Sequence, residues 1–134
     1  MAEPRRVVLA EDDGAVRSAV ADYLQSAGFE VVQTANGAEA INAARSGSPD
    51  LLILDLEMPV MSGRQVLEAW RGDESLRRTP IVLISGAADL TAAAHEYGVR
   101  ATLAKPFDLD VLTAVVEQVL AHPEPPPDSE TIAG

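Results

Sequence analysis

The chain has 134 residues and a net charge of −11, from 21 acidic and 10 basic residues, and it contains no cysteine. This length suits one domain that buries its own core and leaves no room for a second domain of usual size. The excess of acidic residues argues against nucleic acid and anionic membranes as partners, since binding to either needs clustered positive charge on the protein. The lack of cysteine excludes disulfides, which fits a protein of a reducing compartment.

The predicted elements begin with an apolar strand over residues 6–10. This run stops at Glu11, which makes it too short for a signal peptide. Apolar residues then recur at helical spacing over residues 15–24, and Gly28 stands where a glycine commonly follows a helix. The chain therefore opens with a strand and an amphipathic helix.

The same alternation continues along the chain. Predicted strands cover residues 29–34, 51–54, 81–84 and 99–104, and predicted helices cover residues 38–45, 62–70, 90–97 and 109–121. A turn is expected at residues 47–49, and Pro80 stands at a strand entrance, where proline is tolerated. Because only 4% of the residues are aromatic, the core should consist of Val, Leu, Ile and Ala.

Five strand and helix pairs with continuously apolar strands predict an α/β fold. Right-handed crossovers make it a doubly wound, five-stranded parallel sheet with helices on both faces. No stretch approaches the roughly 18 apolar residues that a membrane span requires, so we expect a cytoplasmic protein.

Polar residues with complementary chemistry stand at the predicted strand ends. In doubly wound sheets ligands bind beyond the carboxyl ends of the strands, so these residues should converge. Carboxylates from Glu11, Asp12 and Asp55 would repel one another, and Mg²⁺, which prefers oxygen ligands, would keep them ionised. Ser85 adds a hydroxyl and Lys105 an ammonium, which together favour phosphoryl transfer to an aspartate.

Four motifs at these strand ends resemble those of response-regulator receiver domains in order and spacing. They are Leu9-Ala-Glu-Asp-Asp13, Asp55-Leu-Glu-Met-Pro-Val-Met-Ser-Gly63, Ser85-Gly86 and Leu103-Ala-Lys-Pro-Phe107. One motif alone is weak, but four at matching strand ends are specific. The resemblance covers residues 5–121 and implies the flavodoxin-like strand order 2-1-3-4-5.

The resemblance implies a phosphorylation switch with Asp55 as the phosphoacceptor. Lys105 would pair with the phosphoryl group, and Ser85 would move to hydrogen-bond it, coupling the modification to the predicted helix 90–97 and the strand after it. The peptide bond between Lys105 and Pro106 would be cis. The implied Mg²⁺ ligands are Asp12 directly, Glu11 through water, Asp55, and the backbone carbonyl of Glu57.

By the same resemblance, the chain is a stand-alone response regulator. A histidine kinase or a histidine phosphotransfer protein would supply the phosphoryl group, and the modified chain would signal by binding a downstream protein. It would be no enzyme beyond self-catalysed phosphotransfer and autodephosphorylation. The alternative is a phosphorelay intermediate or a receiver fragment of a larger regulator. The family often pairs through its fourth helix, fifth strand and fifth helix, and small residues at 92–94 leave room for a weak homodimer.

The sequence departs from the family pattern at Thr102, where a Tyr or Phe usually stands three residues before the lysine. This puts the usual aromatic switch in doubt: signalling would rely on Ser85 and backbone shifts, or the protein would relay phosphate without remodelling that face. Glu57 and Ala87 occupy two variable positions that tune phosphoryl lifetime in the family.

Several residues also have structural interpretations. Asp13 is expected to cap a helix rather than bind metal, and the pair Glu11 and Asp12 is compatible with both roles. Phosphorylation of a histidine, at His95 or His122, is disfavoured by their surroundings. Core packing explains Met58 and Met61 better than metal binding does.

The predicted boundaries are a receiver domain over residues 1–121 and a disordered or extended tail over residues 122–134, rich in proline and acids. Two other function classes stay open. Hydrolytic phosphatases of the haloacid-dehalogenase type also use a strand-end Asp, but their motif has a second Asp where this chain has Glu57, and a cap domain is lacking. A constitutive binding module would not need the intact set of Asp12, Asp55, Ser85 and Lys105.

Overall fold

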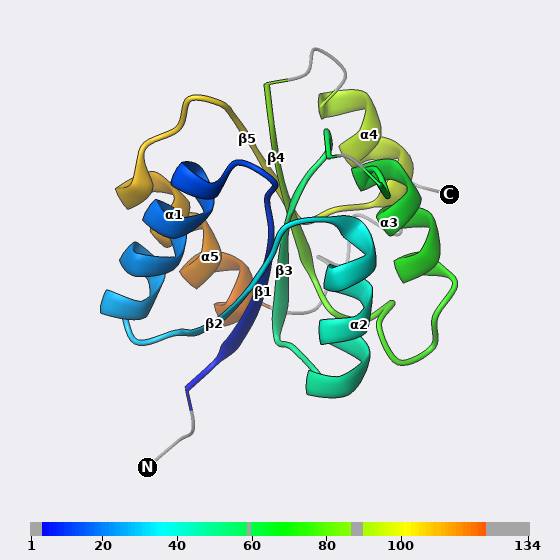
Figure 1. Ribbon diagram of the computed structural model, residues 1–134, viewed down its shortest axis with the longest axis horizontal. Helices are drawn as coiled ribbons and strands as arrows, with labels where there is room; N and C mark the ends of the chain where they lie inside the picture. Colours follow the sequence, from blue (N-terminus) through cyan, green and yellow to red (C-terminus); the bar gives the residue numbers. More distant parts are fainter. Residues whose placement is uncertain (1–3, 59, 87–89, 123–134) are drawn as a thin grey trace.

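The computed structural model describes residues 4–58, 60–86 and 90–122. Within them, strands and helices alternate along the chain as predicted (Figure 1). The elements are β1 (Arg6–Ala10), α1 (Gly14–Ser26), β2 (Glu30–Thr34), α2 (Gly37–Gly47), β3 (Leu51–Asp55), α3 (Gly63–Arg71), β4 (Ile81–Ser85), α4 (Leu90–Tyr97), β5 (Ala101–Ala104) and α5 (Leu109–Ala121).

All strand pairs are parallel, and the order across the sheet is β2-β1-β3-β4-β5. Helices α1 and α5 cover one face, and α2, α3 and α4 cover the other (Figure 1). The doubly wound fold and its strand order are thus confirmed. Strands β3 and β4 are buried along their whole length, which explains their continuous apolar sequence.

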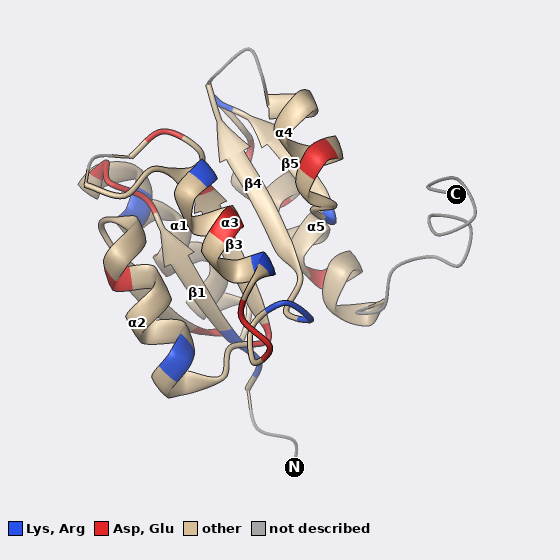
Figure 2. Cartoon of the chain, turned by 90° about the vertical axis from the view of Figure 1, so that its right-hand side faces the viewer, with Lys and Arg blue, Asp and Glu red and all other residues tan. Residues whose placement is uncertain are grey.

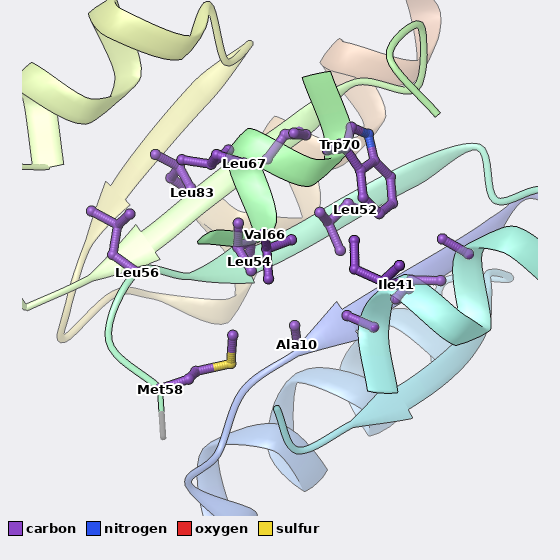
Figure 3. Packing of buried hydrophobic residues seen from close by; sticks show 14 of the residues in the cluster. Ala10, Ile41, Leu52, Leu54, Leu56, Met58, Val66, Leu67, Trp70 and Leu83 are labelled. Atoms are coloured by element: carbon purple, nitrogen blue, oxygen red, sulfur yellow. The ribbon is translucent and has the colours of Figure 1, made fainter. Parts of the chain in front are cut away.

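Alternate residues of the central strands divide between two cores. Val7 and Leu9 of β1 pack with α1 and α5, whereas Val8 and Ala10 pack with α2 and α3. Figure 3 shows the second core, where Trp70 joins the aliphatic side chains. The predicted Val, Leu, Ile and Ala core is therefore confirmed, with one large aromatic residue added.

Two of the differences from the predicted boundaries lie at helix ends. Strand β5 starts at Ala101, two residues later than predicted, because Gly98 turns the chain at a φ of 65° and the Val99 amide donates to the carbonyl of Ala94 in α4. Helix α2 is longer than predicted at both ends. The glycine expected after the first helix is present as Gly28, with a φ of 101°.

The loop between α3 and β4, for which no element was predicted, is folded around Asp73 and Leu76. The carboxylate of Asp73 accepts hydrogen bonds from the hydroxyl and the amide of Ser75, and it forms an ion pair with Arg45 at 3.0 Å. Leu76 is 1% exposed and lies in the core with Trp70. These contacts make the loop before β4 part of the packed fold.

No helix in the described part of the chain is long and apolar enough to cross a membrane. The predicted tail begins at His122, which follows α5 directly and is exposed. Residues 123–134 of that tail lie outside the described residues, as does Ala87, one of the two variable positions.

Candidate functional site

The carboxyl ends of four neighbouring strands meet at one edge of the sheet. In register, Ala10 of β1 lies beside Leu54 of β3, and Ser85 of β4 lies beside Ala104 of β5. The Lys105 amide donates to the carbonyl of Ser85 at 2.9 Å, which extends this pairing past the end of β5. The predicted convergence of the strand ends is therefore present.

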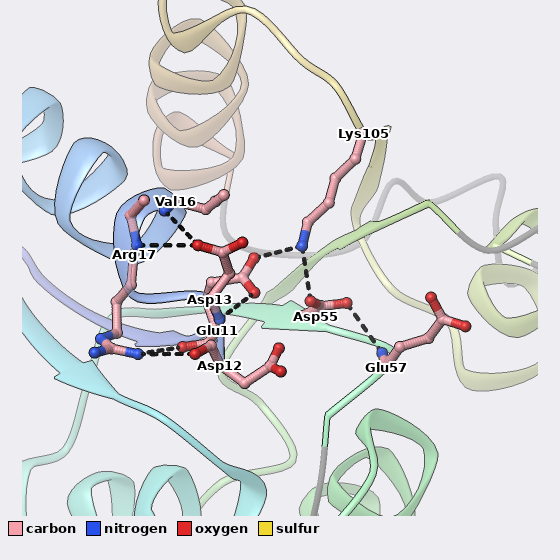
Figure 4. Close-up of polar contacts among 9 residues, drawn as sticks. Glu11, Asp12, Asp13, Val16, Arg17, Asp55, Glu57 and Lys105 are labelled. Carbon is pink, nitrogen blue, oxygen red and sulfur yellow. Dashed lines mark hydrogen bonds and ion pairs between the residues drawn. The ribbon is translucent and has the colours of Figure 1, made fainter.

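Three carboxylates gather at this edge, from Glu11, Asp12 and Asp55. Each offers one oxygen, and these three oxygens lie within 4.8 Å of one another. Figure 4 shows the three side chains directed toward a common space. Glu11 and Asp55 are buried, at 0% and 3% exposure, whereas Asp12 is exposed and leaves the cluster open to solvent.

The ammonium group of Lys105 lies between two of these carboxylates. Its Nζ is 2.6 Å from Glu11 Oε1 and 2.8 Å from Asp55 Oδ2. Burial by itself lowers the pKa of Lys105, but the hydrogen bonds and negative charges of Asp55 and Glu11 outweigh it, and the pKa is raised. Lys105 therefore stays a cation beside Asp55.

Glu11 is electrostatically the least satisfied member of the cluster. Burial raises its pKa to about 7, although the hydrogen bonds from Lys105 and from the Asp13 amide act in the opposite direction. Its buried Oε1 has a single partner within the described residues, the ammonium group of Lys105. Three carboxylates and one ammonium leave two negative charges when all are ionised, which matches a divalent cation.

The residues around Asp55 hold its carboxylate in place. The Glu57 amide donates to Asp55 Oδ1 at 3.0 Å, so both carboxylate oxygens have partners. The Glu57 side chain turns away from Asp55 (Figure 4).

Asp13 caps α1 by accepting hydrogen bonds from the amides of Ala15 and Val16, which confirms its predicted capping role.

Arg17 belongs to the site and was not predicted. Its Nη1 donates to the carbonyl of Glu11 at 2.8 Å and lies 3.5 Å from the carbonyl of Asp12, which fixes the loop that carries both carboxylates (Figure 4). The only sequence clue is its place one turn into the helix that follows the acidic run.

The other predicted residues lie as follows. Ser85 is fully buried at the end of β4, and Thr102 is half-buried on the edge strand β5. The Lys105-Pro106 peptide bond is cis, as expected. Met58 and Met61 pack against the core beside α3, which confirms their structural interpretation. His95 and His122 are exposed and lie outside the carboxylate cluster.

Comparison with known proteins finds a matching family. Residues 7–117 match the family model described as the response regulator receiver domain. The chain is 36% identical over 124 residues to the transcriptional regulatory protein PdtaR of Mycobacterium tuberculosis, covering 90% of this chain and 59% of PdtaR. It is 34% identical over 132 residues to the response regulator Rre1 of Synechocystis, covering 96% of this chain and 57% of Rre1.

A solved structure also superimposes on this chain. The chemotaxis response regulator CheY4 of Vibrio cholerae has a TM-score of 0.81 at 30% identity, covering 87% of this chain and 98% of CheY4. The chain thus spans less than two thirds of the two curated relatives but nearly the whole of the CheY4 chain.

Proposed function

The chain belongs to the response-regulator receiver family of two-component signalling, and we propose that residues 1–121 form a receiver domain that is phosphorylated on Asp55. Members of this family are signalling switches, and an aspartyl phosphate formed with Mg²⁺ is their general property.

The observation that supports Asp55 most directly is its contact with Lys105 inside the carboxylate cluster. In the proposed reaction an oxygen of Asp55 attacks the phosphorus of a phosphohistidine. The O–P bond forms as the N–P bond breaks, and the histidine nitrogen keeps the electron pair. Phosphoryl transfer needs positive charge near the phosphoryl oxygens, and Lys105 supplies it from 2.8 Å away from Asp55 Oδ2.

Glu11, Asp12 and Asp55 would hold Mg²⁺, with the backbone carbonyl of Glu57 as a further ligand. The buried Oε1 of Glu11 and the excess of two negative charges support this assignment. When bound, Mg²⁺ neutralises charge on the carboxylates and on the phosphoryl oxygens. Arg17 contacts the carbonyls of Glu11 and Asp12 and so keeps their backbone in position for binding the ion.

Ser85 would transmit the modification. Ser85 ends β4 beside β5, and its carbonyl accepts a hydrogen bond from the Lys105 amide. A shift of Ser85 toward a phosphoryl group would therefore displace the ends of both strands. Thr102 lacks the bulk of the usual aromatic residue. Signalling would therefore proceed through β4, α4 and β5 backbone shifts, or the protein would pass phosphate on as a relay intermediate. If the downstream partner bound the phosphorylated and the unphosphorylated chain with equal affinity, only the role of relay intermediate would be left.

The surface beside Lys105 suits the protein that donates the phosphoryl group. An apolar hollow of about 430 Å³ opens between α1 and the segment after β5. A phosphohistidine must reach Asp55 from a helix or loop of its own protein, and this hollow offers apolar contact next to the site. It is lined by Val16, Ala19, Val20, Lys105, Pro106, Phe107 and Leu109.

Ala19 offers a test of this donor surface, because it is exposed and lies outside the carboxylate cluster. Ala19→Glu should slow transfer from a phosphorylated histidine kinase found by transfer profiling and should leave modification by acetyl phosphate unchanged. Unchanged transfer from the kinase would place the donor elsewhere.

A phosphatase of the haloacid-dehalogenase type finds less support in the site. Its second acid would have to face the phosphoaspartate from two residues beyond the nucleophile, and the Glu57 side chain at that position turns away (Figure 4). Membership in a longer regulator remains the alternative to a stand-alone protein, and the lengths of the curated relatives are compatible with it.

The deciding experiment is Mg²⁺-dependent modification by acetyl phosphate or beryllofluoride, followed by intact mass and by amide NMR. We expect the wild type to respond only with Mg²⁺ present, and Asp55→Asn to remain folded and unmodified, because an amide is a poor nucleophile. Asp22→Asn, an exposed carboxylate on α1, is the matched control and should behave as the wild type. Modification of Asp55→Asn at the wild-type rate would remove Asp55 from its role, and an inert wild type would favour a constitutive binding module.

A further inference from the structure

A second charged region lies at the opposite edge of the sheet, where β4 and β5 begin. A half-open hollow of about 330 Å³ is enclosed there by the end of α3, the loop before β4 and the end of α4. Its volume is within the range of ligand sites, which begins at about 300 Å³. Of the ten basic residues in the chain, four line this arginine hollow: Arg71, Arg77, Arg78 and Arg100.

Three of these guanidinium groups have no acidic partner in the described part of the chain: Arg71, Arg77 and Arg78 form no ion pair there. Arg71 instead stacks over the ring of Tyr97, 4.9 Å from its centroid. Figure 2 shows basic segments in blue, next to acidic segments in red, in the loop that leads into β4.

The residues that line the arginine hollow include no Asp or Glu. Of the acids on the neighbouring elements, Glu68 accepts a hydrogen bond from the Tyr97 hydroxyl at 2.6 Å, Glu96 pairs with Arg64 at 3.5 Å, and Asp73 pairs with Arg45. Glu74 is exposed on the loop and forms no ion pair with Arg71, Arg77 or Arg78 within the described residues. A concave surface that gathers one sign of charge focuses its field, so the hollow should attract anionic groups.

The described chain ends beside this hollow. Arg100 Nη2 donates to the carbonyl of His122 at 2.5 Å, which places the last described residue beside one wall of the hollow. Residues 123–134 include four prolines and three acids, Glu124, Asp128 and Glu130, and no Lys or Arg. Proline favours an extended path of about 3.1 Å per residue, which would carry these acids roughly 6, 19 and 25 Å from His122.

We propose that the acidic, proline-rich segment 123–134 binds in the arginine hollow, with its carboxylates on Arg71, Arg77 and Arg78. Its prolines would lie against the apolar and aromatic wall formed by Tyr97 and Val99. Because the segment is tethered at His122, its effective concentration is in the millimolar range, and weak contacts suffice. Binding links the end of α5 to α3 and α4. This inference does not depend on phosphorylation of Asp55.

A spin label on the segment tests the proposal in the full chain. The chain has no cysteine, so Ser129→Cys provides a single site for a nitroxide. We expect strong broadening of the amide signals of residues 71–79 and 97–100. The indole signal of Trp70, the single tryptophan, should broaden as well, because Trp70 lines the hollow.

Charge variants separate binding from mere tethering. Replacing the three acids in the labelled chain, with Glu124→Gln, Asp128→Asn and Glu130→Gln, should remove most of the broadening. The pair Arg77→Gln and Arg78→Gln should do the same, as should 1 M salt, where the screening length is about 3 Å. Arg5→Gln, an exposed arginine outside the hollow, is the matched control and should change nothing.

Two results would overturn the proposal. One is broadening at the hollow that is the same for the acidic and the neutralised segment. The other is broadening that arises only between labelled and isotope-labelled copies and grows with concentration, since that would assign the hollow to a second copy of the chain.

Discussion

Replacement of Gly63 by alanine tests how the start of α3 positions the strand end that carries Asp55. A Cβ at residue 63 would lie 2.5 Å from Leu56 Cα and 2.6 Å from the carbonyl oxygen of Asp55. Both are backbone atoms, which cannot rotate away. Restoring an ordinary contact of 3.4 Å requires a shift of 0.9 Å, the difference between 3.4 and 2.5 Å. We therefore expect the Gly63→Ala side chain to displace the segment at Asp55 and Leu56.

The size of the effect follows from two opposing contributions. Overpacking costs about 1–3 kcal/mol. Alanine is favoured over glycine inside a helix by up to about 1 kcal/mol, which offsets part of that cost. The expected net loss, at most about 3 kcal/mol, is smaller than the roughly 5–15 kcal/mol that stabilises a typical domain, so the variant should remain folded.

Gly14→Ala is a closely matched control. Gly14 is the first residue of α1, as Gly63 is of α3, but a Cβ at Gly14 would meet only the Arg17 side chain, at 3.6 Å. Urea unfolding should show Gly63→Ala clearly less stable than Gly14→Ala, and amide NMR should show shifts at Asp55 and Leu56 only in Gly63→Ala. Equal stability of the two variants would refute the packing argument.

Three further predictions concern the site and the loop before β4. Asp12→Asn should weaken Mg²⁺ binding measured by calorimetry, whereas Asp13→Asn should not, because asparagine caps a helix as well as aspartate. Leu76→Ala should lower the free energy of unfolding by about 2–5 kcal/mol, against less than about 0.5 kcal/mol expected for the half-exposed Val111→Ala; equal urea midpoints would contradict this. The Ser75 hydroxyl, and then Arg45, lower the pKa of Asp73 from 3.8 to about 2, so this carboxylate contributes stability above pH 3.8 that is lost as the pH falls toward 2. Ser75→Ala should raise the titration midpoint of the Asp73 carboxyl group in NMR and reduce that acid-induced loss. An unchanged midpoint would assign the shift to Arg45 and the Ser75 amide, which the variant keeps.

The alternation of strands and helices was predictable because each element carries its own periodicity. Strands such as β3 and β4 are buried on both faces and read as unbroken apolar runs. Once parallel strands are inferred, their carboxyl ends must share one edge of the sheet, which places Glu11, Asp55 and Lys105 together.

Contacts between distant segments were not predictable, because they leave no local pattern. Leu76 is a core residue in a loop whose sequence has no hydrophobic periodicity. The direction of the Glu57 side chain depends on the turn after β3. The close approach of Gly63 to Leu56 likewise depends on how α3 meets the end of β3.

The sequence by itself therefore determined the fold, the strand ends and the set of residues at the carboxylate cluster, since short-range periodicity and motif spacing encode all three. Only the tertiary structure decided how those residues are held. It showed Arg17 fixing the Glu11 loop and four arginines from three segments lining one hollow, since both arrangements depend on the packing of elements in space.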